Sequence, residues 1–123
     1  MGKLLQFFHT ISKAGVKNKM KDKVKKLVEE AELLNPWDDW SWEINWRKRL
    51  ELLTVDLIKT IEYLDECSEK ELSYATELLE ELMQHFQSTE LIECIERNIK
   101  RCKDEETIKF LNQELEYMKD VKV

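Results

Sequence analysis

Glycine and proline are scarce in this chain, and their scarcity limits the folds open to it. The 123 residues include two glycines, Gly2 and Gly15, and one proline, Pro36. Tight turns and strand connections depend on these residue types, so the chain favours helices joined by short polar links. Apolar residues at 42% and charged residues at 37% are also typical of amphipathic helices and too apolar for a disordered chain. The sequence therefore predicts one all-α domain over residues 1–123.

The spacing of apolar residues predicts about five helices, in a single antiparallel bundle or a short stack of helical hairpins. A lysine-rich first helix is predicted over residues 1–34, with a break in its pattern at Gly15. Pro36 ends this helix. A Trp-rich connector over residues 35–46 then leads into an acidic helical bundle over residues 47–123. The stripe of the first helix consists of Leu4, Phe8, Ile11, Met20, Val24, Leu27, Ala31 and Leu34.

The acidic part of the chain contains the clearest helix signals. A second helix is predicted over residues 46–64, from the regular stripe formed by Trp46, Leu50, Leu53, Leu57, Ile61 and Leu64. Ser68 and Glu71 form a capping box that begins a third helix, which runs to Phe86. Ser88 and Asp104 are predicted to cap the fourth and fifth helices. The short links between these last helices predict antiparallel neighbours, and no sequence repeat indicates a true solenoid.

Charge is distributed unevenly along the chain. Residues 1–30 contain eight lysines and three acidic residues, whereas residues 51–123 contain nineteen acidic and nine basic residues. Between Glu62 and Glu96, eleven acidic residues accompany a single basic one, Lys70. Such a surface repels nucleic acid and speeds association with a basic protein. Its simpler interpretation is a solvated helix surface that keeps the protein soluble.

The cysteines and the N-terminal residues bear on the compartment. Cys67, Cys94 and Cys102 are odd in number and form no Cys-x-x-Cys pair, so we expect reduced thiols that pack as small apolar groups. No run approaches the roughly 18 apolar residues that a membrane span needs. The apolar run over residues 4–12 is short and makes a poor signal peptide. A cytoplasmic protein without a transmembrane segment is therefore expected.

The sequence offers no set of residues suited to catalysis. His9 and His85 are the only histidines, and neither belongs to a recognisable nucleophile–base pair. Glu81 and His85 are four residues apart, whereas the di-iron motif of helical bundles places Glu and His three apart. Glycine-rich phosphate loops and helix-borne zinc motifs are also missing. We therefore predict no enzyme activity, no catalytic residue, no cofactor, no metal site and no small-molecule substrate.

Four tryptophans between residues 37 and 46 are the most unusual local feature. Trp37, Trp40, Trp42 and Trp46 cannot all face one side of a helix, so we expect some to fill the core and at least one to be exposed. An exposed tryptophan is a common interface anchor. Asp38, Asp39 and Glu43 surround the rings and disfavour stacking on nucleic acid. The basic run over residues 47–49 is able to pair with these acids.

Residues 68–98 resemble a family of bacterial proteins. The segments SEKELSYATELLEEL (68–82) and FQSTELIECIERN (86–98) are similar to small all-helical immunity proteins of polymorphic or contact-dependent growth inhibition toxin systems. This resemblance covers about a quarter of the chain. It implies a protein that binds the C-terminal domain of a cognate toxin, often a basic nuclease, and neutralises it in the producing cell. Binding residues in that family follow no shared motif, and the lysine-rich first helix has no counterpart in it.

The charge run nominates the residues expected to bind such a toxin. The candidate binding residues are Tyr74, Glu77, Glu80, Glu81, Glu93 and Glu96, with Trp37 and Trp40 as further apolar anchors. Two other functions stay open. The stripe of the second helix suits a self-associating structural or regulatory module, and the basic first helix suits a nucleic-acid or membrane-surface binder. Nucleic acid is the less expected partner because most of the chain is acidic.

Overall fold

A computed structural model describes residues 19–121 of the chain, and this part consists of helices without a strand. Its elements are a helix over residues 19–32, α2 (Asp39–Leu53), α3 (Leu57–Glu66), α4 (Glu69–Ala75), the 3-10 helix η1 (Thr76–Leu78), α5 (Leu79–Phe86), α6 (Thr89–Arg101) and α7 (Glu105–Asp120). The predicted all-α fold is confirmed. The predicted stripe positions Leu4, Phe8 and Ile11, the break at Gly15, and His9 lie outside the described residues.

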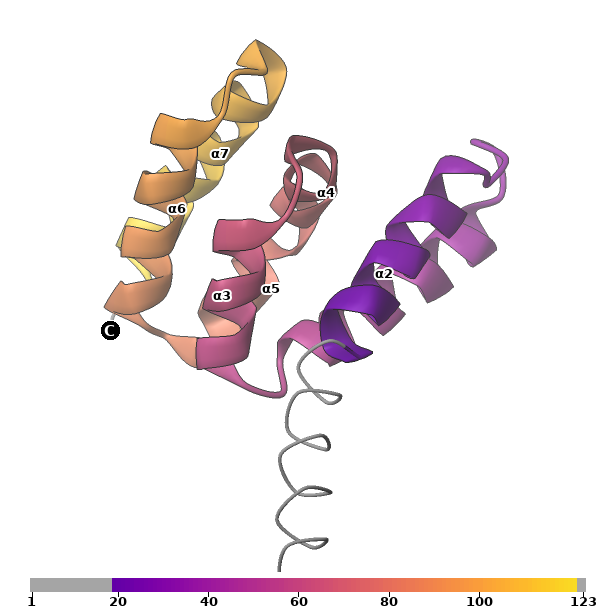
Figure 1. Cartoon of the computed structure of the whole chain (residues 1–123), viewed down its shortest axis with the longest axis horizontal. Coiled ribbons are helices and arrows are strands. Elements are labelled where there is room, and N and C mark those ends of the chain that lie inside the picture. Colours follow the sequence, from indigo (N-terminus) through magenta and orange to yellow (C-terminus); the bar gives the residue numbers. More distant parts are fainter. Residues whose placement is uncertain (1–18, 122–123) are drawn as a thin grey trace, which may run out of the picture.

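The helices pair into antiparallel hairpins that lie side by side (Figure 1). The first hairpin is the 19–32 helix with α2, the second is α3 with α4, η1 and α5, and the third is α6 with α7. The 19–32 helix, α3 and α6 form the nearer layer in Figure 1, and the other helices lie behind them. In the second and third hairpins, α3 packs against α6, and α4, η1 and α5 pack against α7. Of the two predicted arrangements, the chain adopts the stack of hairpins.

Side-chain caps explain where the helices begin. Asp38, Asp56, Ser68, Ser88 and Asp104 each accept a hydrogen bond from a backbone N–H in the first turn of the helix that follows. The predicted caps at Ser68, Ser88 and Asp104 are thus confirmed. In the capping box, the Ser68 hydroxyl accepts from the Glu71 N–H at 3.2 Å and itself donates to the Glu71 carboxylate at 3.2 Å. Each cap satisfies a donor that the helix leaves without an internal partner.

Two predicted boundaries are wrong around the second helix. The helix predicted over residues 46–64 is divided into α2 and α3, because Thr54 ends α2 and Asp56 caps α3 through the Lys59 N–H at 3.1 Å. The Trp-rich connector predicted over residues 35–46 is irregular only as far as Asp38, the N-cap residue of α2, and the helix itself begins at Asp39. The sequence did not reveal this turn because Leu53 and Leu57, on either side of it, are four residues apart and keep the helical spacing of apolar residues.

The third predicted helix forms as one helical run, with a tighter turn inside it. η1 separates α4 from α5 without leaving the right-handed helical region. The run ends at Gln87, whose φ of 46° is the left-handed C-cap conformation that glycine adopts most easily. The fourth and fifth predicted helices correspond to α6 and α7.

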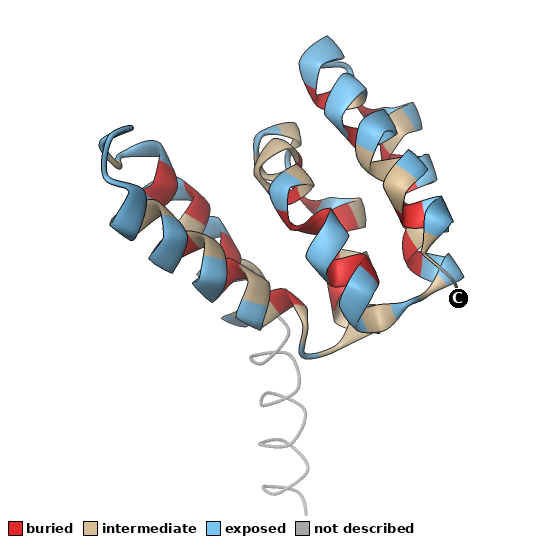
Figure 2. Cartoon of the chain, turned by 180° about the vertical axis from the view of Figure 1, so that it is seen from behind, coloured by how far each residue is buried: buried red, intermediate tan, exposed pale blue. Residues whose placement is uncertain are grey.

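One hydrophobic core runs through the stack from Val24 in the 19–32 helix to Met118 in α7. Buried positions lie along the sides on which neighbouring helices meet (Figure 2). The regular stripe that begins at Trp46 belongs to this core or packs against it. That stripe, which was the predicted seam for self-association, is therefore covered within the chain.

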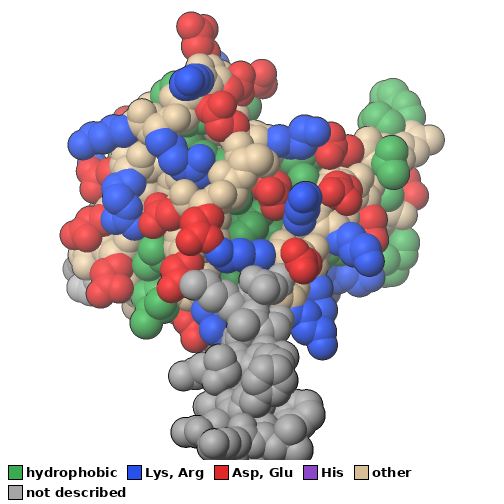
Figure 3. Space-filling view, in the orientation of Figure 1, with side chains coloured by type: hydrophobic (Ala, Val, Ile, Leu, Met, Phe, Trp, Pro, Cys, Tyr) green, Lys and Arg blue, Asp and Glu red, His purple; other side chains and the backbone are tan. Residues whose placement is uncertain are grey.

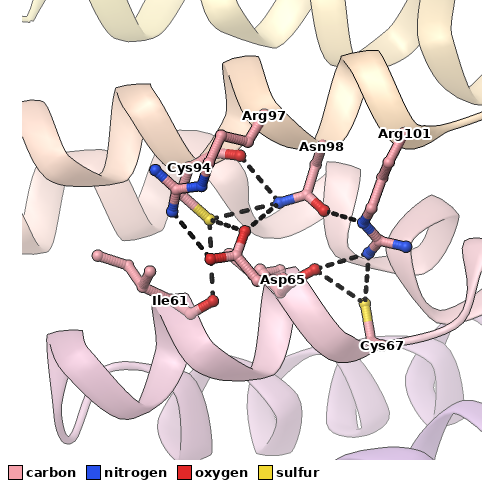
Figure 4. A network of polar contacts seen from close by, with 8 residues as sticks. Ile61, Asp65, Cys67, Cys94, Arg97, Asn98 and Arg101 are labelled. Carbon is pink, nitrogen blue, oxygen red and sulfur yellow. Dashed lines mark hydrogen bonds and ion pairs between the residues drawn. The ribbon is translucent and has the colours of Figure 1, made fainter.

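A polar network around the buried Asn98 joins the second hairpin to the third (Figure 4). Asp65 on α3 accepts hydrogen bonds from Arg97 at 2.8 Å and from the Asn98 amide at 3.1 Å, both on α6. Asn98 is fully buried and also donates to the Cys94 carbonyl at 2.8 Å. Arg101 donates to the Asn98 side-chain oxygen and to the Leu64 carbonyl. Because buried polar groups need such partners, the network holds α3 and α6 in one register.

All three cysteines are buried and unpaired, in agreement with the reduced thiols expected from their odd number and the lack of a Cys-x-x-Cys pair. Burial raises the pKa of Cys67 from 9.0 to about 11 and that of Cys94 from 9.0 to about 12. The thiolate is the reactive form. At about pH 8, Cys67 therefore has about a hundredfold less thiolate than an exposed cysteine.

We expect these two thiols to react slowly in the folded protein. Treatment with a chromogenic thiol reagent at about pH 8 should modify Cys67 and Cys94 at least about a hundredfold more slowly in buffer than in guanidinium chloride. Peptide mapping of the modified chain identifies which thiol has reacted. Equal rates in the two solvents would show that the α3–α6 contact opens readily.

Candidate functional site

A groove of about 570 Å³ lies between α4 and α7, in the farther layer of the stack. Its lining combines carboxylates with two aromatic rings and includes no lysine or arginine among the described residues. The α4–η1 wall is formed by Ser73, Tyr74, Thr76 and Glu77, and the α7 wall by Asp104, Glu106, Thr107, Phe110 and Glu114. We call this feature the acidic groove.

The caps of two helices place the walls of the acidic groove. Asp104 caps α7 by accepting from the Thr107 N–H at 3.1 Å and from the Thr107 hydroxyl at 2.6 Å. Glu69, in the first turn of α4, accepts the Asp104 N–H at 3.3 Å, so the start of α7 is tied to the start of α4. Phe110 follows Glu106 by one helical turn and is 42% exposed. The ring therefore faces the groove beside a carboxylate.

The α7 wall contains a carboxyl group in an unfavourable setting. Glu114 is half-buried, and its Oε2 atom accepts no hydrogen bond from the described residues. Burial, and then the nearby Glu80 carboxylate, raise the pKa of Glu114. Both effects disfavour the charged form. A cationic group in the groove would stabilise the charged form of Glu114 and offset the repulsion from Glu80, so the groove suits a basic occupant.

The α4–η1 wall is held in place by a buried arginine of α2, Arg49. Arg49 on α2 is 1% exposed, and its guanidinium donates to the Glu77 carboxylate and to the Tyr74 carbonyl, each at 3.1 Å. The same group lies 5.7 Å from the centre of the Tyr74 ring and donates to the Asn45 side-chain oxygen at 2.8 Å. Trp46 adds a bond from its indole N–H to the Glu77 carbonyl at 3.1 Å. These contacts fix Tyr74 and Glu77 against the first hairpin.

The predicted binding residues do not form a single surface. Tyr74 and Glu77 line the acidic groove, and Glu80 lies close enough to Glu114 to affect its charge. Glu81 is exposed on α5 outside the groove lining. The remaining predicted residues are exposed elsewhere, namely Glu93 and Glu96 on α6 and Trp37 and Trp40 in the first hairpin.

Sequence reasoning missed the α7 wall and the role of Arg49. Phe110 lies off the predicted stripe of its helix, formed by Ile108, Leu111, Leu115 and Met118, and an aromatic residue off the stripe is a signal that could have marked an exposed site. The basic run was expected to pair with neighbouring acids. Arg47 does so with Glu43 at 2.9 Å. Arg49 instead turns inward to Glu77, and no local pattern indicates that difference.

The lysine-rich helix presents a mixed surface. Lys19, Lys23, Lys25 and Lys26 are exposed, whereas Lys21 is half-buried and pairs with Glu66 on α3. Acidic residues occupy other exposed positions on the same helix, namely Asp22, Glu29, Glu30 and Glu32. Nucleic-acid or membrane binding through this helix stays a prediction.

Two further structural features concern metals and membranes. Within residues 19–121, no group of three or more His, Cys, Asp or Glu side chains is arranged to hold a metal ion. In the same part of the chain, no helix combines the length and the apolar character needed to cross a membrane.

His85 contacts Phe86 edge to face, with ring centres 4.8 Å apart.

Comparison of the chain with protein-family models, with curated proteins and with solved structures gave no match.

Proposed function

We propose that this chain is a binding protein that holds a basic segment of a protein toxin in the acidic groove and thereby neutralises the toxin. The observation that carries the proposal is the lining of the groove, in which Tyr74 and Phe110 lie among carboxylates and no lysine or arginine of the described residues takes part. Carboxylates attract a lysine or arginine side chain, and aromatic faces bind its cation and its aliphatic stem. A partner with a basic active-site cleft fits this chemistry.

Two further points support a toxin as the partner. The segment that resembles immunity proteins, residues 68–98, supplies the Tyr74 and Glu77 wall of the groove. A neutralising protein also needs a preformed surface, since ordering a flexible surface on binding would weaken the complex. Arg49 provides that rigidity beneath the wall, through its bonds to Tyr74 and Glu77.

Charge reversal at the groove tests the proposal. The test variant is the full chain with Glu80→Lys and Glu106→Lys. Both carboxylates are exposed; Glu106 lines the groove, and Glu80 lies at its edge near Glu114. Reversing a charge at an interface costs roughly 1–2 kcal/mol. We therefore expect binding to the toxin domain to weaken by about a hundredfold, measured by titration calorimetry.

A matched control has the same change of charge at a different place. Glu93→Lys with Glu96→Lys alters two exposed carboxylates on α6, away from the groove lining, and we expect its affinity to stay within about threefold of the unaltered chain. Loss of binding in the α6 variant alone would move the site to α6. Unchanged binding in both variants would show that acidic residues do not carry recognition.

The partner is to be found by capture from the cells that encode the chain. Tagged full-length protein, beside the Glu80→Lys, Glu106→Lys variant, is used to capture partners, which are identified by mass spectrometry. A toxin domain captured by the unaltered chain only, whose growth inhibition the unaltered chain relieves on co-expression, supports the proposal. A partner that is captured by the unaltered chain only, but that does not inhibit growth, would overturn the toxin assignment. The acidic groove would then still be the binding site.

A further inference from the structure

The two ends of the hairpin stack differ in polarity. Every exposed residue of α6 and α7 is polar or charged except Phe110, which lies in the acidic groove. The first hairpin, at the opposite end, exposes Leu33, Trp37 and Trp40 at 88%, 89% and 71%. Hydrophobic side chains accordingly gather at the right edge of the molecule in Figure 3, over this hairpin. Stacked helical repeats usually have a polar outer face at each end, and among the described residues the first hairpin is the less polar end of this stack.

Two connected hollows run along the first hairpin. One, of about 390 Å³, lies between the 19–32 helix and α2 and has Leu27 and Leu52 among its lining residues. The other, of about 190 Å³, shares Lys23 and Leu52 with the first and extends to Val55. Ile44 and Trp40 are four and eight residues before Lys48, which lines the first hollow, so helical spacing places them on the same side of α2. We call this surface the end face.

Charge along the 19–32 helix changes sign within the end face. Lys23 and Lys26 line the first hollow toward one end of the 19–32 helix, and Glu30 lines it toward the other. Lys23 and Glu30 are seven residues apart, which is two turns or about 10 Å along the helix. Both side chains are exposed. Along the 19–32 helix the lining is therefore basic on one side of the apolar Leu27 and acidic on the other, while Lys48 and Glu51 of α2 add one charge of each sign.

We propose that two copies of this chain pair through the end face in an antiparallel, two-fold arrangement. In a two-fold interface, if residue i of one copy contacts residue j of the other, then residue j also contacts residue i. The two facing helices therefore run in opposite directions. With the axis near Leu27, the Lys23 of each copy meets the Glu30 of the other. The pairing also covers Trp40 and Ile44, and it continues the hairpin-on-hairpin packing that the second and third hairpins already use.

The mixed charge favours a second copy over other occupants. An anionic membrane or a nucleic acid calls for a face of mainly positive charge, and a basic protein calls for a mainly acidic one. The lining of the first hollow has three lysines and two glutamates. The edge formed by the 19–32 helix has its two signs separated along its length, so this edge complements itself when it is turned around. This interface lies on the first hairpin, apart from the acidic groove, and is independent of the proposed toxin binding.

A charge swap tests the pairing. Sedimentation velocity of the full chain, from about 1 µM to about 100 µM, should show a dimer. Lys23→Glu alone places acids against Glu30, and Glu30→Lys alone places bases against Lys23, so each variant should dimerise at least about tenfold more weakly. An equimolar mixture of the two variants restores opposite charges and should form the mixed dimer. Both positions are exposed, so circular dichroism should show an unchanged fold.

Three outcomes would overturn the proposal. The first is an unaltered chain that stays monomeric at about 100 µM. The second is a mixture of the two charge variants that does not associate. The third is a Trp40→Ala variant that dimerises as strongly as the unaltered chain. A monomeric chain that instead binds phosphatidylserine vesicles through the Trp40 face would assign the end face to a membrane surface. Toxin binding by Lys23→Glu should match that of the unaltered chain, which separates a failure here from a failure of the acidic groove.

Discussion

Replacing Arg49 with alanine is expected to lower the free energy of unfolding by about 3 kcal/mol. The guanidinium is 1% exposed and bonds to Asn45, the Tyr74 carbonyl and Glu77. Truncation leaves the buried Asn45 side-chain oxygen without its donor, removes the bonds to Tyr74 and Glu77, and opens a cavity between the first and second hairpins. Urea unfolding followed by circular dichroism measures the change.

Two companion variants separate the causes. Arg49→Met keeps most of the side-chain volume but supplies no donor, so we expect it to recover less than half of the lost stability. Arg47→Ala removes a neighbouring arginine whose ion pair with Glu43 is more than half exposed, and its expected cost is about 0.3 kcal/mol. A loss for Arg49→Ala as small as that for Arg47→Ala would show that the two hairpins do not depend on the buried guanidinium.

Replacing Asn98 with alanine is expected to cost about 2 kcal/mol. Its amide donates to Asp65 and to the Cys94 carbonyl, and its oxygen accepts from Arg101. The exposed Asn112 on α7, whose amide donates only to the Ile108 carbonyl one turn back, is a matched control. Asn112→Ala should cost less than about 0.5 kcal/mol. Equal costs in urea unfolding would contradict the role assigned to the α3–α6 network.

Asn98→Asp adds a test of the same contact by pH. The substitution keeps the side-chain shape but places a second carboxylate against Asp65, and two close carboxylates raise the pKa of at least one of them. The folded state then favours the protonated form. Stability relative to the unaltered chain should therefore fall as pH rises through that raised pKa, and recover as pH is lowered. A pH-independent difference would place residue 98 away from Asp65.

The stability of the first two hairpins and the shape of the acidic groove depend on the same residue. Arg49 orients Glu77 and Tyr74 on the groove wall while it closes the contact between α2 and η1. A moderate loss of stability at Arg49 should therefore accompany weaker partner binding, whereas Asn98→Ala should leave binding by the folded fraction unchanged. This contrast links the proposed site to the fold.

Helix content and helix starts could be predicted from the sequence because both arise from short-range interactions. The scarcity of Gly and Pro, and caps such as Ser88 and Asp104, act within a single turn of chain. The division between α2 and α3 was missed because Leu53 and Leu57 continue the apolar period across the turn. Asp56, a good N-cap residue, was the local signal that could have marked it.

The candidate site was only half visible in the sequence. Tyr74 and Glu77 were predicted from the acidic run, whereas Phe110 and Glu114 become their neighbours only when α7 packs beside α4. Glu93 and Glu96 belong to the same acidic run but lie on α6, outside the groove lining. Clustering of charge along a chain does not reveal which helices the fold brings together.

The sequence by itself determined that this chain is helical and where most helices begin. Only the tertiary structure decided that Arg49 meets Glu77, that Asp65 meets Asn98, and that the end face lies on the first hairpin. The physical reason is that helical periodicity specifies which side of each helix is apolar but not which helix covers it. Partners some thirty residues apart are chosen by packing, and packing depends on the whole stack at once.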